Sequence, residues 1–114
     1  MPIYRFGTDE QKQEWLPALA AGEKLGAFGL TEPGGGSDAG ATRTTAKLDG
    51  DEWVINGPKA FITNSGTDIT SVITVTAITG ERDGGKKEIS AIMIPAGTPG
   101  LRVAKPYSKV GWCS

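Results

Sequence analysis

Hydrophobic positions follow a helical spacing only near the N-terminus of the chain. Trp15 and Leu19 are one helical turn apart and would share a face with Leu16. Thr8 and Gln11 have the spacing of a capping box, in which each side chain bonds the other residue's backbone amide. The pattern therefore predicts one helix that begins after Thr8, with Trp15 as a core anchor.

Two residues are expected to shape the end of this helix. Pro17 has no amide hydrogen and disfavours a helical conformation in the residue before it, so we expect a kink or a restart there. Gly22 is placed to form the C-terminal cap, because glycine readily adopts the left-handed conformation that such caps require. The helix is therefore expected to end before residue 25.

Beyond residue 25 the pattern changes to that of β-strands. Alternating or β-branched segments are separated by Asp-Gly and Asn-Gly turn signals at residues 49–52 and 56–58. The expected strands are one ending in "FGLTE" and those over residues 42–48, 53–56, 59–64, 69–79 and 88–95. Short strands at this spacing after a single helix predict a mainly β fold: a small, partly incomplete β-barrel of short antiparallel strands.

The C-terminal half contains a charged loop and one further expected strand. Residues 80–87, "GERDGGKK", are predicted to form a solvated, mobile loop. Residues 101–106 are expected to form a strand, and a closed barrel would need one more strand to pair with it. Because both ends of the sequence also look cut, we expect the chain to be a fragment of a longer protein.

Composition and charge exclude several classes of function. The net charge of −1 gives no basic surface for nucleic acid, and no apolar run is long enough to span a membrane. The chain has no histidine, which rules out Ser-His-Asp and Cys-His catalysis and zinc sites that need imidazole, and we predict no metal site. A single cysteine, Cys113, excludes a disulfide framework and fits a reducing, cytoplasmic location.

The segment "GLTEPGGGSDAGA", residues 29–41, is the strongest candidate for chemistry. Its glycines formally fit the G-x-G-x-x-A dinucleotide fingerprint, but the residues that follow are typical of a strand and not of the required helix. No Walker A string is present. A plain loop remains possible, as does a concavity of backbone amides that receives a planar or anionic ligand with help from Thr31 and Ser37. Asp38 would repel a phosphate and is expected to bond its own backbone.

Two stretches of the chain resemble the signatures of the acyl-CoA dehydrogenase family. "FGLTEPGGGSDAGA" meets every position of the family's first signature, and "DGDEWVINGPKAFITN" resembles the next segment, in which an Asn-Gly turn leads to an aromatic-Ile-Thr-Asn strand. "FGTDEQKQEWLPALAAGE" resembles the preceding helix, and "GTPGLRVAKPYSKVGW" the later strands. The resemblance implies the end of an N-terminal helical domain at residues 1–24 and a central flavin-contacting β-barrel domain at residues 25–114, truncated before its last strand and without the C-terminal helical domain.

Members of this family use FAD to remove two hydrogens across the Cα–Cβ bond of an acyl-CoA thioester. The resemblance implies that Ser37 reaches the FAD pyrophosphate or the substrate, and that the Thr63 hydroxyl lies near flavin N5. The implied cofactor-binding residues are Phe28, Leu30, Thr31, Gly36, Ser37, Phe61, Ile62 and Thr63. Many relatives carry tryptophan where this chain has Phe61, which keeps the aromatic contact with a smaller ring.

No catalytic residue is expected in this chain. The family's base is a glutamate of the C-terminal helical domain, whereas Glu32 belongs to the first signature. The isolated fragment is therefore expected to bind FAD weakly or not at all and to be inactive. The resemblance also implies an electron-transfer flavoprotein as acceptor and a homo-tetrameric or dimeric parent protein. The alternatives are an acyl-CoA oxidase or flavin monooxygenase of the same fold, and a non-catalytic β-barrel that binds a partner through residues 81–87 and an exposed edge.

Overall fold

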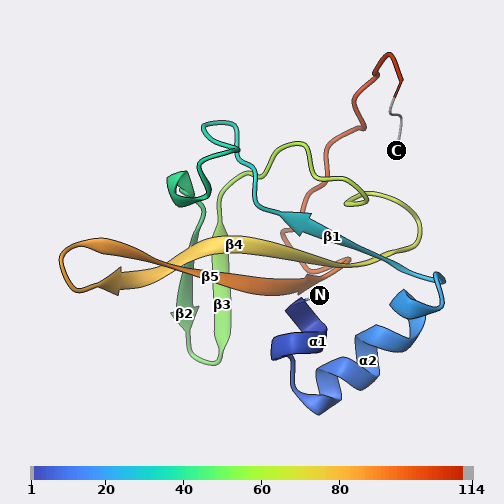
Figure 1. The fold of residues 1–114 in the computed structure, drawn as a ribbon, viewed down its shortest axis with the longest axis horizontal. Helices are drawn as coiled ribbons and strands as arrows, with labels where there is room; N and C mark the ends of the chain where they lie inside the picture. The colour runs from blue at the N-terminus through green and yellow to red at the C-terminus, as the bar shows by residue number, and fades with distance from the viewer. Residues whose placement is uncertain (1, 112–114) are drawn as a thin grey trace.

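A five-stranded mixed sheet forms the centre of the computed structural model, which describes residues 2–111 (Figure 1). The longest strand, β4, is central: β5 pairs with it antiparallel along one edge, and β1 and β2 pair with it in parallel along the other. β3 pairs antiparallel with β2. The strands are β1 (Leu25–Gly29), β2 (Thr45–Asp49), β3 (Glu52–Asn56), β4 (Thr70–Arg82) and β5 (Lys86–Pro95).

One cluster of the hydrophobic core lies on one face of β1 and β4. Ala27, Ile73 and Val75 are buried there, and four partly buried apolar residues pack against them: Ile55, Ile62, Ile94 and Leu101. The β-branched residues of β4 suit this position because they pack well on a pleated surface. The strand expected over residues 69–79 is thus confirmed, and it continues to Arg82.

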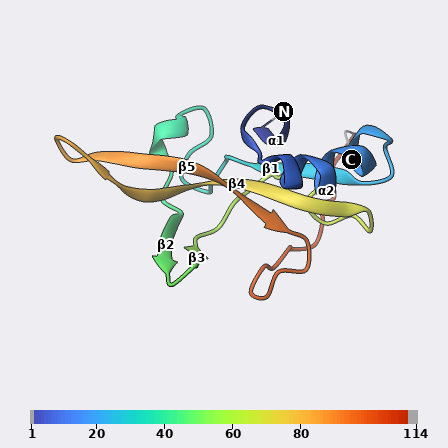
Figure 2. The same ribbon diagram turned by 90° about the horizontal axis from the view of Figure 1, so that it is seen from below.

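Helices α1 (Pro2–Phe6) and α2 (Asp9–Ala20) lie on one side of strands β4 and β5, and the β2–β3 hairpin projects to the other side (Figure 2). The predicted capping box is present, since Gln11 donates its backbone amide to the Thr8 hydroxyl at 3.2 Å and the Thr8 amide donates to Gln11 at 3.0 Å. Gly22 has a φ of +75° and follows the helix as predicted. Trp15 is only half-buried.

The restart expected at Pro17 is wrong, because α2 runs unbroken through it to Ala20, and the alternative of a kink there stays a prediction. The carbonyl that loses its amide partner to Pro17 belongs to Gln13, and both residues are exposed. Water can therefore satisfy the freed carbonyl, which keeps the cost of the proline low. The other helix, α1, precedes α2, spans only five residues and is not predicted by the sequence.

The prediction of a mainly β fold with a helix in front is confirmed, but two details of the sheet differ. The strands are not all antiparallel, since β1 runs parallel to β4. About forty residues separate these two strands, which is ample for a parallel crossover, whereas the tight turns join only antiparallel pairs. The sheet is open and is not closed into a barrel.

Three expected boundaries are also corrected. Residues 59–64 form no strand, because Phe61 and Asn64 have φ values of +59° and +63° that a strand does not allow. Residues 101–106 form no strand. The charged loop shrinks to residues 83–85, since β4 and β5 extend to either side of Gly84 and Gly85, whose φ values are +80° and +74°. Cys113 lies outside the described residues.

Within residues 2–111, no helix has the length and apolar character needed to cross a membrane.

Candidate functional site

The glycine-rich segment leaves β1 and immediately turns back on itself. The Glu32 amide donates to the Gly35 carbonyl at 2.9 Å, and the Gly35 amide donates to the Glu32 carbonyl at 3.0 Å. Pro33 and Gly34 form the corner, where proline is favoured in tight turns. No heavy atom lies within 4 Å of the position that a Cβ on Gly34 would take. The chain's own packing therefore does not require glycine at this exposed corner, which leaves its backbone open to a ligand.

Asp38 stabilises the second half of this segment. Its Oδ1 accepts from the Gly40 amide at 3.0 Å, and its carbonyl accepts from the Ala41 amide at 3.1 Å, which begins the single-turn helix η1 (Ala39–Ala41). The expectation that Asp38 bonds its own backbone is confirmed. The neighbouring Ser37 is exposed.

The buried carboxylate of Glu32 joins the two ends of the glycine-rich segment. Its Oε2 accepts from the Arg43 amide at 2.8 Å, and its Oε1 accepts from the Thr44 amide at 3.0 Å. The Lys59 ammonium lies 2.8 Å from the same Oε1, and the Glu32 and Lys59 side chains are only 6% and 10% exposed. This is a buried ion pair whose acid also satisfies two backbone donors.

Burial alone would raise the pKa of Glu32, but the hydrogen bonds from Lys59, Thr44 and Arg43 outweigh burial and lower the pKa to about 2. Glu32 is therefore ionised at neutral pH and is a very weak base. Both oxygens are already engaged, so this carboxylate is unsuited to abstract a proton from a substrate.

A hydrogen bond between backbones joins the two segments that carry the family signatures. The Ala60 amide donates to the Thr31 carbonyl at 2.9 Å. A Cβ on Gly36 would lie 3.5 Å from the Thr31 methyl group, so the glycine-rich turn also packs beside Thr31. We call residues 30–31, 36–37 and 61–63 together the Thr31–Phe61 wall.

The residues that follow Ala60 present different surfaces. Phe61 is 72% exposed and has a φ of +59°, which is unusual for a bulky residue and marks local strain. Its ring lies 5.5 Å from that of Tyr107, at an interplanar angle of 33°. Thr63 is exposed, whereas the side chain of Ile62 packs against the core. The wall thus combines an exposed aromatic ring with exposed hydroxyl groups.

The structure brings most of the predicted cofactor-binding residues together. Leu30 and Thr31 meet the Phe61–Thr63 turn through the Ala60 bond, and Gly36 lies beside Thr31 with Ser37 next in the chain. Phe28 precedes Leu30 by two residues and belongs to β1. Its side chain is 51% exposed and lies on the face of the strand opposite Ala27. Within the part of the chain that the structure describes, neither Phe28 nor Ser37 forms a hydrogen bond with residues 61–63.

Sequence reasoning missed Lys59 and Tyr107, and it gave Glu32 no role. The opposite charges of Glu32 and Lys59 are visible in the sequence, but their partnership depends on a fold that brings together residues 27 positions apart. Tyr107 belongs to a segment without regular secondary structure, and no pattern predicts its contact with Phe61.

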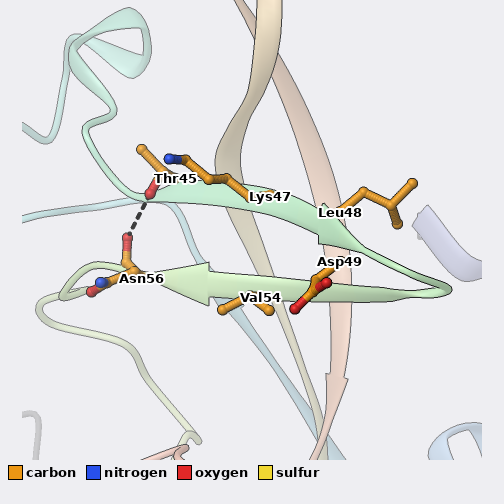
Figure 3. Close-up of a pocket in the computed structure, with 6 residues that line it drawn as sticks. All are labelled: Thr45, Lys47, Leu48, Asp49, Val54 and Asn56. Carbon is orange, nitrogen blue, oxygen red and sulfur yellow. Dashed lines mark hydrogen bonds between the residues drawn. The ribbon is translucent and has the colours of Figure 1, made fainter.

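A shallow hollow on the β2–β3 hairpin lies apart from the wall. Figure 3 shows its lining side chains along both strands, with the Thr45 hydroxyl bonded to the Asn56 carbonyl at 3.4 Å. Leu48 and Val54 expose apolar surface there. None of the predicted cofactor-binding residues lines this hollow, so it does not coincide with the signatures.

Comparisons with known proteins agree with the signatures. The family model "Acyl-CoA dehydrogenase, middle domain" matches residues 27–113, and "Acyl-CoA dehydrogenase, N-terminal domain" matches residues 1–23. A probable acyl-CoA dehydrogenase of Bacillus subtilis is 54% identical over 110 residues, which cover 96% of this chain and 28% of the relative. The chain therefore spans little more than a quarter of that relative's length.

Solved structures give the same result. A glutaryl-CoA dehydrogenase from Mycobacterium smegmatis in complex with FADH2 is 44% identical, with a TM-score of 0.83 over 95% of this chain and 26% of that one. A chain in the structure of the electron transferring flavoprotein of Acidaminococcus fermentans is 48% identical, with a TM-score of 0.83 over 96% of this chain and 28% of that one. The chain described here belongs to the acyl-CoA dehydrogenase family and corresponds chiefly to its middle domain.

Proposed function

We propose that this chain is the flavin-contacting part of an FAD-dependent acyl-CoA dehydrogenase, which oxidises the Cα–Cβ bond of an acyl-CoA thioester. The hydrogen bond from the Ala60 amide to the Thr31 carbonyl carries the proposal, because it joins both family signatures into one surface. The FADH2 complex of the Mycobacterium smegmatis relative supports the cofactor. The division into residues 1–24 and 25–114 stays a prediction.

The residues of the Thr31–Phe61 wall fit a planar flavin. Phe61 offers an exposed aromatic face, and the space beside Gly34 is free of other chain atoms. Phe28, Leu30, Thr31, Gly36, Ser37, Phe61, Ile62 and Thr63 would hold the cofactor, with Ser37 also contacting the substrate. Ile62 would act through its backbone, because its side chain packs against the core.

The chain supplies binding and electrostatic support, while the catalytic base comes from elsewhere in the protein. FAD, when bound, accepts a hydride from the acyl group. Backbone amides and the hydroxyl groups of Thr31 and Thr63 can donate hydrogen bonds where negative charge develops, without adding a competing base. Glu32 cannot take the substrate's α-proton, since its pKa is about 2 and both its oxygens are engaged.

The partners and the cellular setting are proposed on the same basis. An electron-transfer flavoprotein is the proposed electron acceptor, consistent with the Acidaminococcus fermentans match. A tetrameric or dimeric parent protein and a cytoplasmic location are what the family resemblance and the lone cysteine favour. Of the sequence alternatives, an acyl-CoA oxidase or a flavin monooxygenase would share the wall, and oxygen consumption during turnover would distinguish them.

Absorbance spectroscopy of the full-length protein that contains this chain tests the proposal. We expect a yellow protein with a flavin spectrum that bleaches anaerobically when a saturated acyl-CoA is added. In the same experiment, FAD mixed with isolated residues 1–114 should not bleach, because the base is absent. A colourless full-length protein that cannot be reconstituted with FAD would contradict the proposed function.

A further inference from the structure

The edge of β4 has a break in its strand pairing next to the Thr31–Phe61 wall. β1 pairs with β4 as far as Val75, and β2 meets β4 only at Ile78. The break therefore covers Thr76 and Ala77. In this break the Lys59 ammonium donates to the Thr76 hydroxyl at 3.0 Å.

The Lys59 ammonium has three hydrogens and meets three acceptors. Besides Thr76, these are the Glu32 carboxylate at 2.8 Å and the Leu30 carbonyl at 3.4 Å. Each acceptor belongs to a different part of the break: the end of β1, the glycine-rich turn and β4. A lysine with all three donors used in this way is fully satisfied although it is buried.

Glu32 forms the hydrogen bonds on the β2 side of this break. It accepts the amides of Arg43 and Thr44, and the Thr44 carbonyl in turn accepts from the Ile78 amide at 2.8 Å, where β2 joins β4. The two side chains together thus connect the end of β1 with the start of β2 across the whole glycine-rich segment.

We propose that Lys59 and Glu32 are a positioning pair, which holds the two arms of the Thr31–Phe61 wall at the spacing that a flavin requires. This inference rests on the proposed function. One arm, residues 30–31 and 36–37, begins at Leu30, whose carbonyl Lys59 binds, and the other, residues 61–63, follows Ala60, the residue directly after Lys59. Neither Lys59 nor Glu32 needs to touch the cofactor to set this spacing.

Gly29 provides a second way to displace the lysine. A Cβ on Gly29 would lie 3.3 Å from Lys59 Cγ and 3.1 Å from Val75 Cγ1. The backbone of Gly29 has an ordinary negative φ, so alanine is compatible with the strand itself. Gly29→Ala therefore crowds both the aliphatic stem of Lys59 and the side chain of Val75, while it keeps the charge of Lys59.

The test measures FAD binding and the flavin spectrum of the full-length protein and its Lys59→Met, Glu32→Gln and Gly29→Ala variants. Lys12→Met is the matched control, because Lys12 pairs with the exposed Asp9 at 3.2 Å, far along the sequence from the wall. We expect Lys59→Met and Glu32→Gln to weaken FAD binding by about tenfold or more, an effect of the size of one lost charged contact. At saturating FAD, the absorbance maximum and the midpoint potential should also differ from those of the wild type.

The readouts separate positioning from mere stabilisation. A pair that only stabilised the fold would leave the spectrum and the potential of the saturated protein unchanged, and that result would overturn the proposal. If Lys59→Met does not fold, Gly29→Ala decides: unchanged FAD affinity and spectrum overturn the proposal, and altered values support it. A wild-type protein that binds no FAD would instead refute the proposed function itself.

Discussion

The Glu32–Lys59 pair and the Thr31–Phe61 wall are neighbours with opposite physical character. The pair is buried, and its hydrogen bonds reach four residues in three separate segments of the chain: Leu30, Arg43 with Thr44, and Thr76. The wall contains exposed side chains, and Phe61 contacts only another exposed ring in the described aromatic pairs. The difference indicates a division of labour, in which buried charges fix positions and exposed groups offer contacts.

This division explains how the wall can be exposed to solvent and still keep a defined conformation. Exposed glycines and a strained Phe61 would by themselves leave many conformations accessible. The Ala60–Thr31 bond and the buried pair restrict them from behind. Changes to the pair should therefore reduce both stability and FAD binding, whereas changes to the wall should reduce binding with little effect on stability.

Removing the buried cation should have the largest effect on stability. Lys59→Met leaves the Glu32 carboxylate buried without its counter-charge, so we expect the free energy of unfolding to fall by about 3–5 kcal/mol. Urea denaturation of the full-length protein measures this change. Lys12→Met, at the exposed pair, should cost under about 1 kcal/mol. Equal effects of the two substitutions would remove the distinction between the regions.

Gly57 lies close to Thr44, whose backbone amide donates a hydrogen bond to Glu32. Its φ is +147°, and an added Cβ would lie 2.5 Å from the Thr44 hydroxyl oxygen. We expect Gly57→Ala to destabilise the protein by roughly 2–4 kcal/mol, because both the conformation and the space are unfavourable. Gly50→Ala is the control, since Gly50 also has a positive φ but no atom within 4 Å, and it should cost about 1 kcal/mol. A smaller loss at Gly57 than at Gly50 would show that the packing around Thr44 is loose.

Low pH should weaken the pair in a predictable direction. The pKa of Glu32 is about 2 in the folded protein and 4.5 as the ordinary value, so its contribution is fully present above pH 4.5 and is lost as the pH falls toward 2. The stability difference between the wild type and Glu32→Gln should therefore shrink by on the order of 2–3 kcal/mol from pH 6 to pH 2.5. Glu14→Gln, at an exposed position, serves as the control. A difference that stays constant over this range would contradict the assigned contacts.

Phe61 should show the opposite behaviour from Lys59. Phe61→Gly removes an exposed ring and relieves a positive φ, so its unfolding free energy should stay within about 1 kcal/mol of the wild type. Its affinity for FAD should fall several-fold, as measured by titration of flavin fluorescence. Phe61→Trp keeps an aromatic face and should retain binding. Full FAD affinity in Phe61→Gly would exclude this ring from the site.

The sequence predicted the parts of the molecule that depend on local chemistry. The capping box at Thr8, the cap at Gly22 and the strand over β4 follow from side chains acting on their own backbone or on one face of a strand. The parallel pairing of β1 with β4 could not be predicted, because it depends on contacts between distant segments. The sequence wrongly predicts a strand around Phe61. The aromatic and β-branched residues of this segment favour β-structure, but its backbone does not adopt it.

The candidate site was predicted by resemblance and not by physical pattern. The motifs named the residues of the wall, and the structure supplied the bond between Ala60 and Thr31 that brings them together. The ion pair of Glu32 and Lys59 can be recognised only in the folded structure, since nothing in either residue's local sequence identifies the other.

Amide hydrogen exchange of the full-length protein with and without FAD tests the wall most directly. If both arms contact the cofactor, FAD should slow exchange in residues 30–37 and 60–64 together, while exchange in the β2–β3 hairpin stays unchanged. Protection confined to one arm, or to the hairpin hollow around Leu48 and Val54, would contradict a single flavin surface built from both signatures.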